Sequence, residues 1–168
     1  MATSQASDGS DFEQMFDMAP VSLWLEDYSG LKNLFEKWRA NGVTDLARHL
    51  AEDTRRVHQC MREFKILRVN QHTLDLFHAP SLQALRSRLD EVFRDDMQVT
   101  VVDELLQLWN GQLEWSNRTC NYTLNGQRLD VKLRSRILNG HEATWDRVLL
   151  TLENITPEED ARKLLTQR

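Results

Sequence analysis

The sequence predicts an α+β domain in which several short helices precede most of an antiparallel sheet. Apolar residues at helical spacing dominate residues 31–64. Apolar and polar residues then alternate over residues 127–138, as in a strand with one buried face. The dipeptide Asn125-Gly126, which is typical of a tight β-hairpin, lies just before this strand. Apolar residues make up 40% of the 168 residues, which is enough to build a folded core.

The N-terminal part is predicted to contain a polar tail, a short helix and the first strand. Residues 1–11 are mostly polar and indicate a flexible tail. A short helix around residues 12–18 would end before Pro20, because proline cannot continue a helix. Residues 21–26 have the composition of a strand, and Tyr28-Ser29-Gly30 interrupts it.

Residues 31–64 are predicted to form about three short helices inserted after the first strand. Asn41-Gly42 indicates a helix end, since both residues tolerate the left-handed conformation. Asp53 is a typical residue at the start of a helix and indicates the second break. Two apolar stripes support this, Leu31, Leu34, Phe35 and Trp38 in the first helix and Val57, Cys60, Met61 and Phe64 in the last.

The next segment is predicted to hold a short strand and three helices. Residues 65–69 form the strand, and Asn70 is placed to cap a small helix. Ser81 would cap a second helix, and Asp95 or Asp96 would begin a longer one. The apolar stripe of the longer helix is Val101, Leu105, Leu108 and Trp109.

The remaining chain is predicted to be mostly strand. Residues 112–124 and 127–138 form a hairpin, and residues 147–153 form the last strand. Pro157 then lies in the first turn of a final helix, where its missing N–H leaves no hydrogen bond unmade.

Composition and motifs exclude several classes of function. The net charge is −5 and no basic cluster stands out, which argues against a nucleic-acid surface. No apolar run approaches the roughly 20 residues that span a bilayer, and the polar N-terminus does not resemble a signal peptide. We therefore expect a cytoplasmic location. Cys60 and Cys120 lie in no metal-binding spacing, and no nucleotide-binding, nucleophile-elbow or metalloprotease motif occurs, so no catalytic activity is predicted.

Three motifs in this order resemble a PAS sensory domain. Residues 66–77 resemble the PAS pattern of a strand that ends in Asn and leads into a small helix, although His78 stands where many members have Gly. The second motif is the Asn125-Gly126 hairpin, and the third is Glu153-Asn154-Ile155-Thr156, which resembles the element that ends many PAS domains. The resemblance implies a five-stranded antiparallel sheet in the order 2-1-5-4-3 with helices on one face. The helical insertion between strands 1 and 2 resembles that of N-terminal PAS domains of bacterial diguanylate cyclases and histidine kinases.

The resemblance also implies a function and a domain plan. Residues 12–156 would be a sensory domain that binds a small ligand between sheet and helices, with residues 31–64 as its helical insertion. Residues 157–168 would begin a signalling helix toward a covalently linked output domain, and a homodimer is expected. The alternatives are a ligand-free dimerisation module and a haem- or flavin-binding redox sensor. The insertion either caps the pocket or contacts a partner chain.

No cofactor is predicted, although two deserve comparison with the residues present. Haem needs an axial ligand, for which His72 and His78 are the candidates, but a lone His in such a place is more often structural. A flavin photosensor of this family would need a Cys in the segment Asn70-Gln71-His72-Thr73, which has none. Trp24 could stack on a non-covalent flavin, but a Trp in a strand usually packs in the core.

Candidate ligand-binding residues follow from a two-residue turn at Asn125-Gly126. In that register Tyr122 faces Leu129 and Arg118 faces Leu133, so the β-hairpin would turn Arg118 toward the core. A buried guanidinium needs an acidic partner, a polar ligand or a bulge that turns it outward. An anionic ligand held by Arg118 is one reading, and an internal partner or a bulge is the other. The expected binding residues are Arg118, Tyr122, Ser116, Ser135, Cys120 and Leu133.

Overall fold

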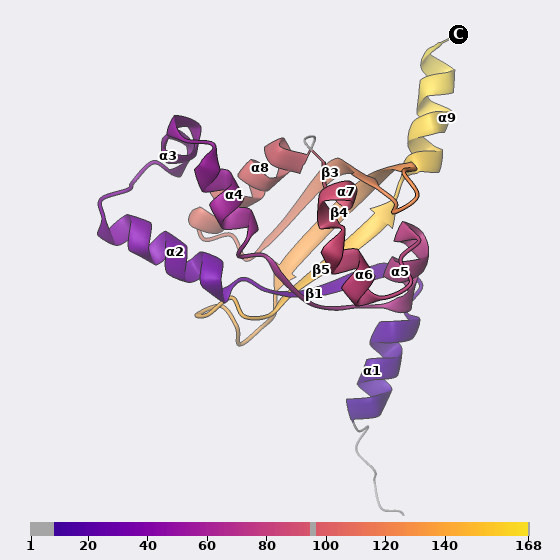
Figure 1. Cartoon of the computed structure of the whole chain (residues 1–168), viewed down its shortest axis with the longest axis horizontal. Helices are drawn as coiled ribbons and strands as arrows, with labels where there is room; N and C mark the ends of the chain where they lie inside the picture. Colours follow the sequence, from indigo (N-terminus) through magenta and orange to yellow (C-terminus); the bar gives the residue numbers. More distant parts are fainter. Residues whose placement is uncertain (1–8, 95–96, 168) are drawn as a thin grey trace, which may run out of the picture.

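The computed structural model describes residues 9–94 and 97–167 and centres on one five-stranded antiparallel sheet (Figure 1). The strand order β2-β1-β5-β4-β3 confirms the predicted order. The strands are β1 (Ser22–Asp27), β2 (Lys65–Val69), β3 (Glu114–Tyr122), β4 (Arg128–Ile137) and β5 (Val148–Asn154). Buried positions alternate along β1, β4 and β5, so one face of the sheet carries the core.

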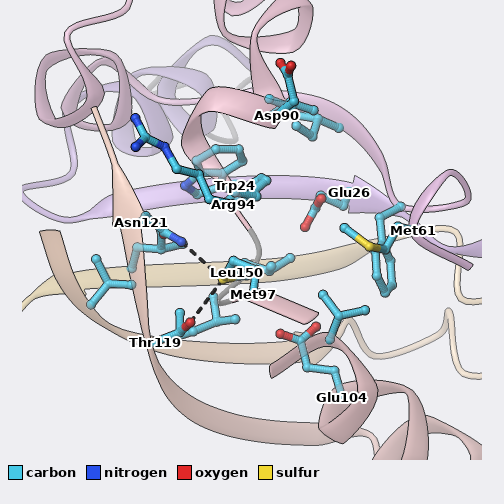
Figure 2. A pocket seen from close by; sticks show the side chains of 18 of the residues that line it. Trp24, Glu26, Met61, Asp90, Arg94, Met97, Glu104, Thr119, Asn121 and Leu150 are labelled. Carbon is cyan, nitrogen blue, oxygen red and sulfur yellow. Dashed lines mark hydrogen bonds between the residues drawn. The ribbon is translucent and has the colours of Figure 1, made fainter. Parts of the chain in front are cut away.

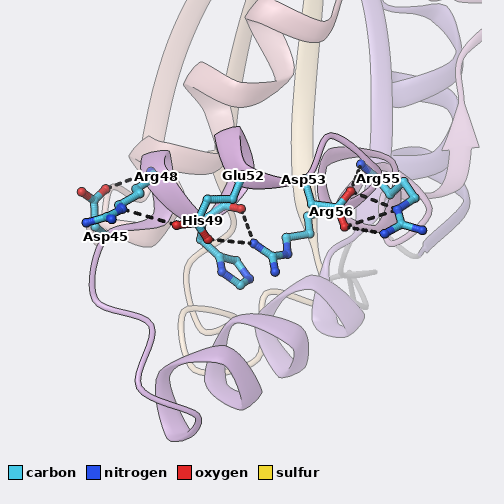
Figure 3. Close-up of polar contacts among 7 residues, drawn as sticks. All are labelled: Asp45, Arg48, His49, Glu52, Asp53, Arg55 and Arg56. Atoms are coloured by element: carbon cyan, nitrogen blue, oxygen red, sulfur yellow. Dashed lines mark hydrogen bonds and ion pairs between the residues drawn. The ribbon is translucent and has the colours of Figure 1, made fainter.

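The predicted insertion consists of three helices, α2 (Ser29–Ala40), α3 (Leu46–Glu52) and α4 (Arg55–Met61). This confirms the breaks near Asn41-Gly42 and Asp53. Helix α2 begins earlier than expected, at Ser29, whose N–H donates to the Asp27 carboxylate at 2.8 Å. The turn between α3 and α4 is held by charged side chains (Figure 3). Asp53 accepts hydrogen bonds from the Arg55 backbone and guanidinium, which lower its pKa to about 2.

An aromatic cluster attaches the insertion to the rest of the domain. Phe35 of α2 meets the edge of Trp109 at 5.2 Å between ring centroids and that of Trp145 at 6.0 Å. Trp109 ends helix α8 (Met97–Trp109), and Trp145 lies in the loop between β4 and β5. The Tyr28 N–H donates to the Trp145 carbonyl at 2.8 Å, so the start of the insertion is fixed to that loop. The expected start of α8 at Asp95 or Asp96 lies outside the described residues.

Helix α5 (Gln71–Phe77) is joined to β1 through the buried side chain of Asn70. Its amide oxygen accepts from the N–H groups of Thr73 and Leu23, both at 3.1 Å, and its amide nitrogen donates to the Val21 carbonyl at 2.8 Å. The predicted helix cap is confirmed, and it also links two segments far apart in the sequence. His78 ends this helix with φ of 53°, a conformation that glycine adopts with less strain.

The segment after α5 contains two helices where one was expected. Ser81 caps α6 (Leu82–Ser87) as predicted, but the chain breaks at Arg88 and α7 (Leu89–Val92) follows. The Arg88 guanidinium donates to the Leu124 carbonyl at 2.8 Å, which ties this break to the β3–β4 loop. Arg86, near the end of α6, donates to the Ile66 carbonyl of the edge strand β2 and to the Leu67 carbonyl at 3.4 Å.

The β3–β4 hairpin exists, but the predicted register is wrong by one residue. Tyr122 pairs with Arg128, and the loop is the three residues Leu124-Asn125-Gly126, with Gly126 at φ of 87°. Leu124 is buried and its N–H donates to the Phe77 carbonyl at 2.9 Å, so a contact with helix α5 removes it from the strand. A one-residue shift turns every side chain of β3 to the opposite face.

Two terminal helices extend away from the sheet (Figure 1). Helix α1 (Gly9–Met18) begins at Gly9, earlier than the expected residue 12, and the rest of the expected tail lies outside the described residues. Helix α9 (Thr156–Thr166) carries Pro157 in its first turn, as predicted. The two helices point in different directions and neither has a buried residue.

Candidate ligand-binding cavity

A cavity of about 830 Å³ lies between the core face of the sheet and the helices α4, α7 and α8. Strands β1, β3, β4 and β5 all contribute side chains to its wall. Most of the wall is apolar and comes from Trp24, Met61, Phe64, Phe93, Met97, Val101, Val131, Leu133, Leu150 and Leu152. The helical insertion therefore supplies part of the wall, through α4 and the residues after it.

Trp24 forms a fixed part of this wall. Its indole N–H donates to the Ser22 hydroxyl at 3.0 Å, and that hydroxyl shares a 2.7 Å hydrogen bond with the Thr73 hydroxyl. Thr73 in turn donates to the side chain of Asn70 at 2.9 Å. The indole also packs edge-on against Phe77 at 5.7 Å between centroids. Helix α5 thus fixes the orientation of the indole through a chain of buried hydrogen bonds.

Two buried carboxyl groups belong to the cavity wall, Glu26 from β1 and Glu104 from α8 (Figure 2). Glu26 is 6% exposed and accepts a hydrogen bond from the Tyr28 hydroxyl at 3.1 Å. Glu104 is 4% exposed. In Figure 2 the two carboxyl groups border the same space from opposite sides, Glu26 from β1 and Glu104 from α8. Neither carboxyl group has an ion-pair partner among the described residues.

Burial changes the protonation of both groups. Loss of hydration raises the pKa of Glu26 to about 7, although the Tyr28 hydroxyl partly opposes this. Loss of hydration and the negative charge of Glu26 raise the pKa of Glu104 to about 8, with the Asn117 amide in partial opposition. The Trp115 indole N–H lies near Glu104 but makes no hydrogen bond to it. At neutral pH this pair therefore retains at least one proton.

Strand β3 adds two polar groups that sit on either side of the Met97 sulfur (Figure 2). The Asn121 amide nitrogen donates to this sulfur at 3.2 Å, and the Thr119 hydroxyl donates to it at 3.1 Å. Asn121 is 1% exposed, and its amide oxygen has no partner among the described residues. A buried acceptor without a partner is costly, which makes Asn121 a candidate contact for a bound molecule.

The rim of the cavity is charged and exposed. It consists of His58 and Arg62 from the insertion, and of Asp90 and Arg94 on either side of the α7 end. The Arg94 guanidinium stacks on the Tyr122 ring, with 3.8 Å between its central carbon and the ring centroid. Charged side chains thus surround an interior whose polar groups are the two carboxyl groups and the side chains of Tyr28, Thr119 and Asn121.

The register correction separates the residues that were expected to form the site. Leu133 lines the cavity, and Ser135 faces the same side of the sheet, where it is buried. Arg118, Tyr122, Ser116 and Cys120 lie on the other face of β3. Arg118 is exposed and pairs with Glu159 of α9 at 3.5 Å, while Tyr122 lies under Arg94 and Cys120 is buried. The expected anion site around Arg118 therefore does not form inside the cavity.

Two local signals could have identified the acidic residues that the sequence analysis missed. Glu26 follows Trp24 by two residues, which places both on one face of a strand. Glu104 follows Val101 by three residues, which places it on the apolar stripe of α8. Carboxylates are rarely buried without a partner, so the residue type by itself argues for exposure at both positions.

Cofactor and metal ligands can be compared with the same geometry. Neither Cys60 nor Cys120 lines the cavity, and burial raises the pKa of the Cys60 thiol to about 12. His72 and His78, the candidates for haem, do not line it either. In the described ranges no three His, Cys, Asp or Glu side chains come together as a metal site. No helix there is long and apolar enough to cross a bilayer.

Comparison with known proteins rests on structure alone. No protein-family model matches the chain, and no curated protein matches it. A LOV protein of Rhodobacter sphaeroides matches with a TM-score of 0.56 and 16% identity over 89% of this chain and 69% of that chain. The PAS domain of a Colwellia psychrerythraea protein matches with a TM-score of 0.57 and 11% identity over 88% and 97%. The LOV domain of a blue-light activated histidine kinase from Erythrobacter litoralis matches with a TM-score of 0.52 and 12% identity over 81% and 96%. The chain therefore has the PAS fold, as its sequence motifs predict.

Proposed function

We propose that this chain is a sensory input domain that binds a small molecule in the cavity between the sheet and helices α4, α7 and α8. The observation that supports this most directly is the cavity itself, about 830 Å³ with an apolar wall and a few buried polar groups. Ligand pockets in proteins have this size and this mixture of surfaces. A signal would then pass through α9 to an output domain, for which a diguanylate cyclase or a histidine kinase is our proposal.

The proposed route from the cavity to α9 runs through the start of β4. Val131 lines the cavity, and its neighbour Asp130 holds the start of α9. The Asp130 N–H donates to the Thr156 hydroxyl at 2.9 Å, and its carbonyl accepts from the Ile155 N–H at 2.8 Å. A ligand that displaces Val131 therefore acts next to the attachment of this helix. It shifts the helix only if it binds two arrangements of this attachment with different affinity.

A homodimer is the second part of the proposal, and exposed apolar side chains on the terminal helices support it. Phe12 and Met15 of α1 are 60% and 67% exposed, and Leu164 and Leu165 of α9 are 67% and 71% exposed. Helices of this length are marginal alone in water. A two-fold contact that buries either group would stabilise its helix and bring two cytoplasmic output domains together.

Mass spectrometry of small molecules released from the denatured purified protein tests the ligand proposal. We expect a molecule to be released from the wild type and to be reduced at least tenfold in Val101→Trp, whose indole fills the cavity. Val99→Trp is the matched control, because Val99 lies two residues away on α8 and is 79% exposed. Release of nothing from the wild type, together with a higher melting temperature for Val101→Trp, would favour a dimerisation module without a ligand.

A further inference from the structure

We propose that the cavity selects a small organic cation, a protonated amine or amidine on an apolar or aromatic body, whose charge lies between Glu26 and Glu104. This rests on the proposed function, since it names the chemical class of the ligand in the same cavity. Two carboxyl groups share the wall of an otherwise apolar space (Figure 2). An ionised carboxyl group in such a place is costly unless a donor or a positive charge accompanies it.

The hydrogen-bonding balance of the interior supports the same class of ligand. Three side-chain donors of the interior are already used, since the Tyr28 hydroxyl donates to Glu26, and the Thr119 hydroxyl and Asn121 amide donate to the Met97 sulfur. The acceptors are not, because the Asn121 amide oxygen has no partner among the described residues and the carboxyl groups have spare lone pairs. A ligand rich in N–H groups complements this interior, whereas a carboxylate or phosphate does not.

The aromatic part of the wall suits the body of such a ligand. Tyr28, whose hydroxyl bonds to Glu26, lies 4.6 Å from Phe64 between ring centroids, and Trp24 lies 6.0 Å from Phe93. Ring faces attract a cation and also cover an apolar body. The site therefore combines charge recognition by carboxylates with an aromatic enclosure.

Binding of a cation should release a proton from the carboxyl pair. A carboxylic acid that meets an ammonium group loses its proton to the solvent, and the resulting carboxylate forms an ion pair with the ammonium group. The affinity for the cation therefore rises with pH as long as Glu26 and Glu104 together still hold a proton. Other titratable or charged groups nearby also influence the protonation of Glu26 and Glu104. These groups are Tyr28, His58, Arg62, Asp90, Arg94 and Asp103.

Three probes with one indole body separate charge from shape. Tryptamine is the cation, tryptophol is the neutral alcohol and indole-3-acetate is the anion. Isothermal titration at pH 6 and pH 8 is expected to give tryptamine at least tenfold higher affinity than tryptophol at pH 8. We expect its affinity to rise about tenfold from pH 6 to pH 8, with release of a proton measured in buffers of different ionisation enthalpy.

The double variant Glu26→Gln with Glu104→Gln is expected to bind tryptamine and tryptophol equally. Glu114→Gln, which removes an exposed charge of β3 outside the cavity, should change tryptamine affinity less than threefold. Circular dichroism and melting of the double variant establish that it folds, and single Gln variants serve if it does not. Equal binding of tryptophol by the wild type, preferred binding of the anion, or no binding of tryptamine at pH 8 would overturn the assignment. None of these outcomes would overturn the proposed function, which the Val101→Trp extraction tests independently.

Discussion

The stability of the folded domain should fall as the pH rises from about 5 to about 8, and Glu104→Gln should remove much of this fall. Glu104 keeps its proton in the folded protein because burial and Glu26 raise its pKa to about 8, whereas in the unfolded chain it ionises near its ordinary value of 4.5. Between these two values the folded state holds more protons than the unfolded chain. Unfolding therefore releases a proton, and the free energy of unfolding decreases with pH over this interval and levels off above it.

The magnitude follows from the proton count. One proton released on unfolding gives a slope of about 1.4 kcal/mol per pH unit. Across the interval from pH 5 to pH 8, Glu104 alone contributes about 2 to 4 kcal/mol, the lower figure applying when water in the cavity solvates the carboxylate. Such a change is a large fraction of the roughly 5–15 kcal/mol that stabilise an ordinary domain. Glu26 adds a smaller contribution of the same sign, because its raised pKa of about 7 is lower.

Urea denaturation followed by tryptophan fluorescence, at half-unit steps from pH 5 to pH 8.5, measures this effect. The glutamine variant should be the more stable protein at pH 8 and should lose that advantage at pH 5. Glu114→Gln removes the same charge at an exposed position of β3 and should give a curve parallel to the wild type. Parallel curves for Glu104→Gln and the wild type would refute the buried, protonated state of this carboxyl group.

Three further predictions concern the cap, the corrected register and the terminal helices. Asn70→Ala should lower the free energy of unfolding by about 3 kcal/mol, because it leaves buried backbone groups unpaired and removes a helix cap. In the same urea denaturation assay, the control Gln71→Ala, at an exposed neighbouring position, should lower it by less than about 0.5 kcal/mol. Arg118→Ala should leave tryptamine affinity within twofold of the wild type in calorimetry, and a tenfold loss would return Arg118 to the site. Light scattering at micromolar concentrations should show a dimer for the wild type and a monomer for Phe12→Glu with Leu164→Glu; a monomeric wild type contradicts the dimer proposal.

Local signals were sufficient for much of the fold. Asn41-Gly42 and Asp53 marked the ends of the inserted helices because helix termination depends on residues within one turn. Asn70 was identified as a cap for the same reason. The alternation of β4 also predicted which of its side chains are buried, since the period of a strand is a local property.

The hairpin register and the two buried carboxyl groups could not be predicted, because both depend on contacts between segments far apart in the sequence. The loop length of the hairpin depends on Leu124, which bonds to the carbonyl of Phe77 in another element. That single contact decided the face of Arg118 and so the composition of the expected site. Local spacing places Glu26 and Glu104 on the core-facing side of their elements, but it does not show that they line a cavity. That cavity is enclosed by elements far apart in the sequence.

The position of Arg86 affects how this sheet meets other molecules. A strand at the edge of a sheet offers free carbonyl and N–H groups, through which a second chain can extend the sheet and start aggregation. On β2 the guanidinium of Arg86 already donates hydrogen bonds to the carbonyl groups of Ile66 and Leu67. An incoming strand would have to displace this charged group before it could form its own ladder. Helix α6 thus protects an edge that includes the partly exposed, apolar Leu67, and the protein gains resistance to intermolecular strand pairing from one side chain.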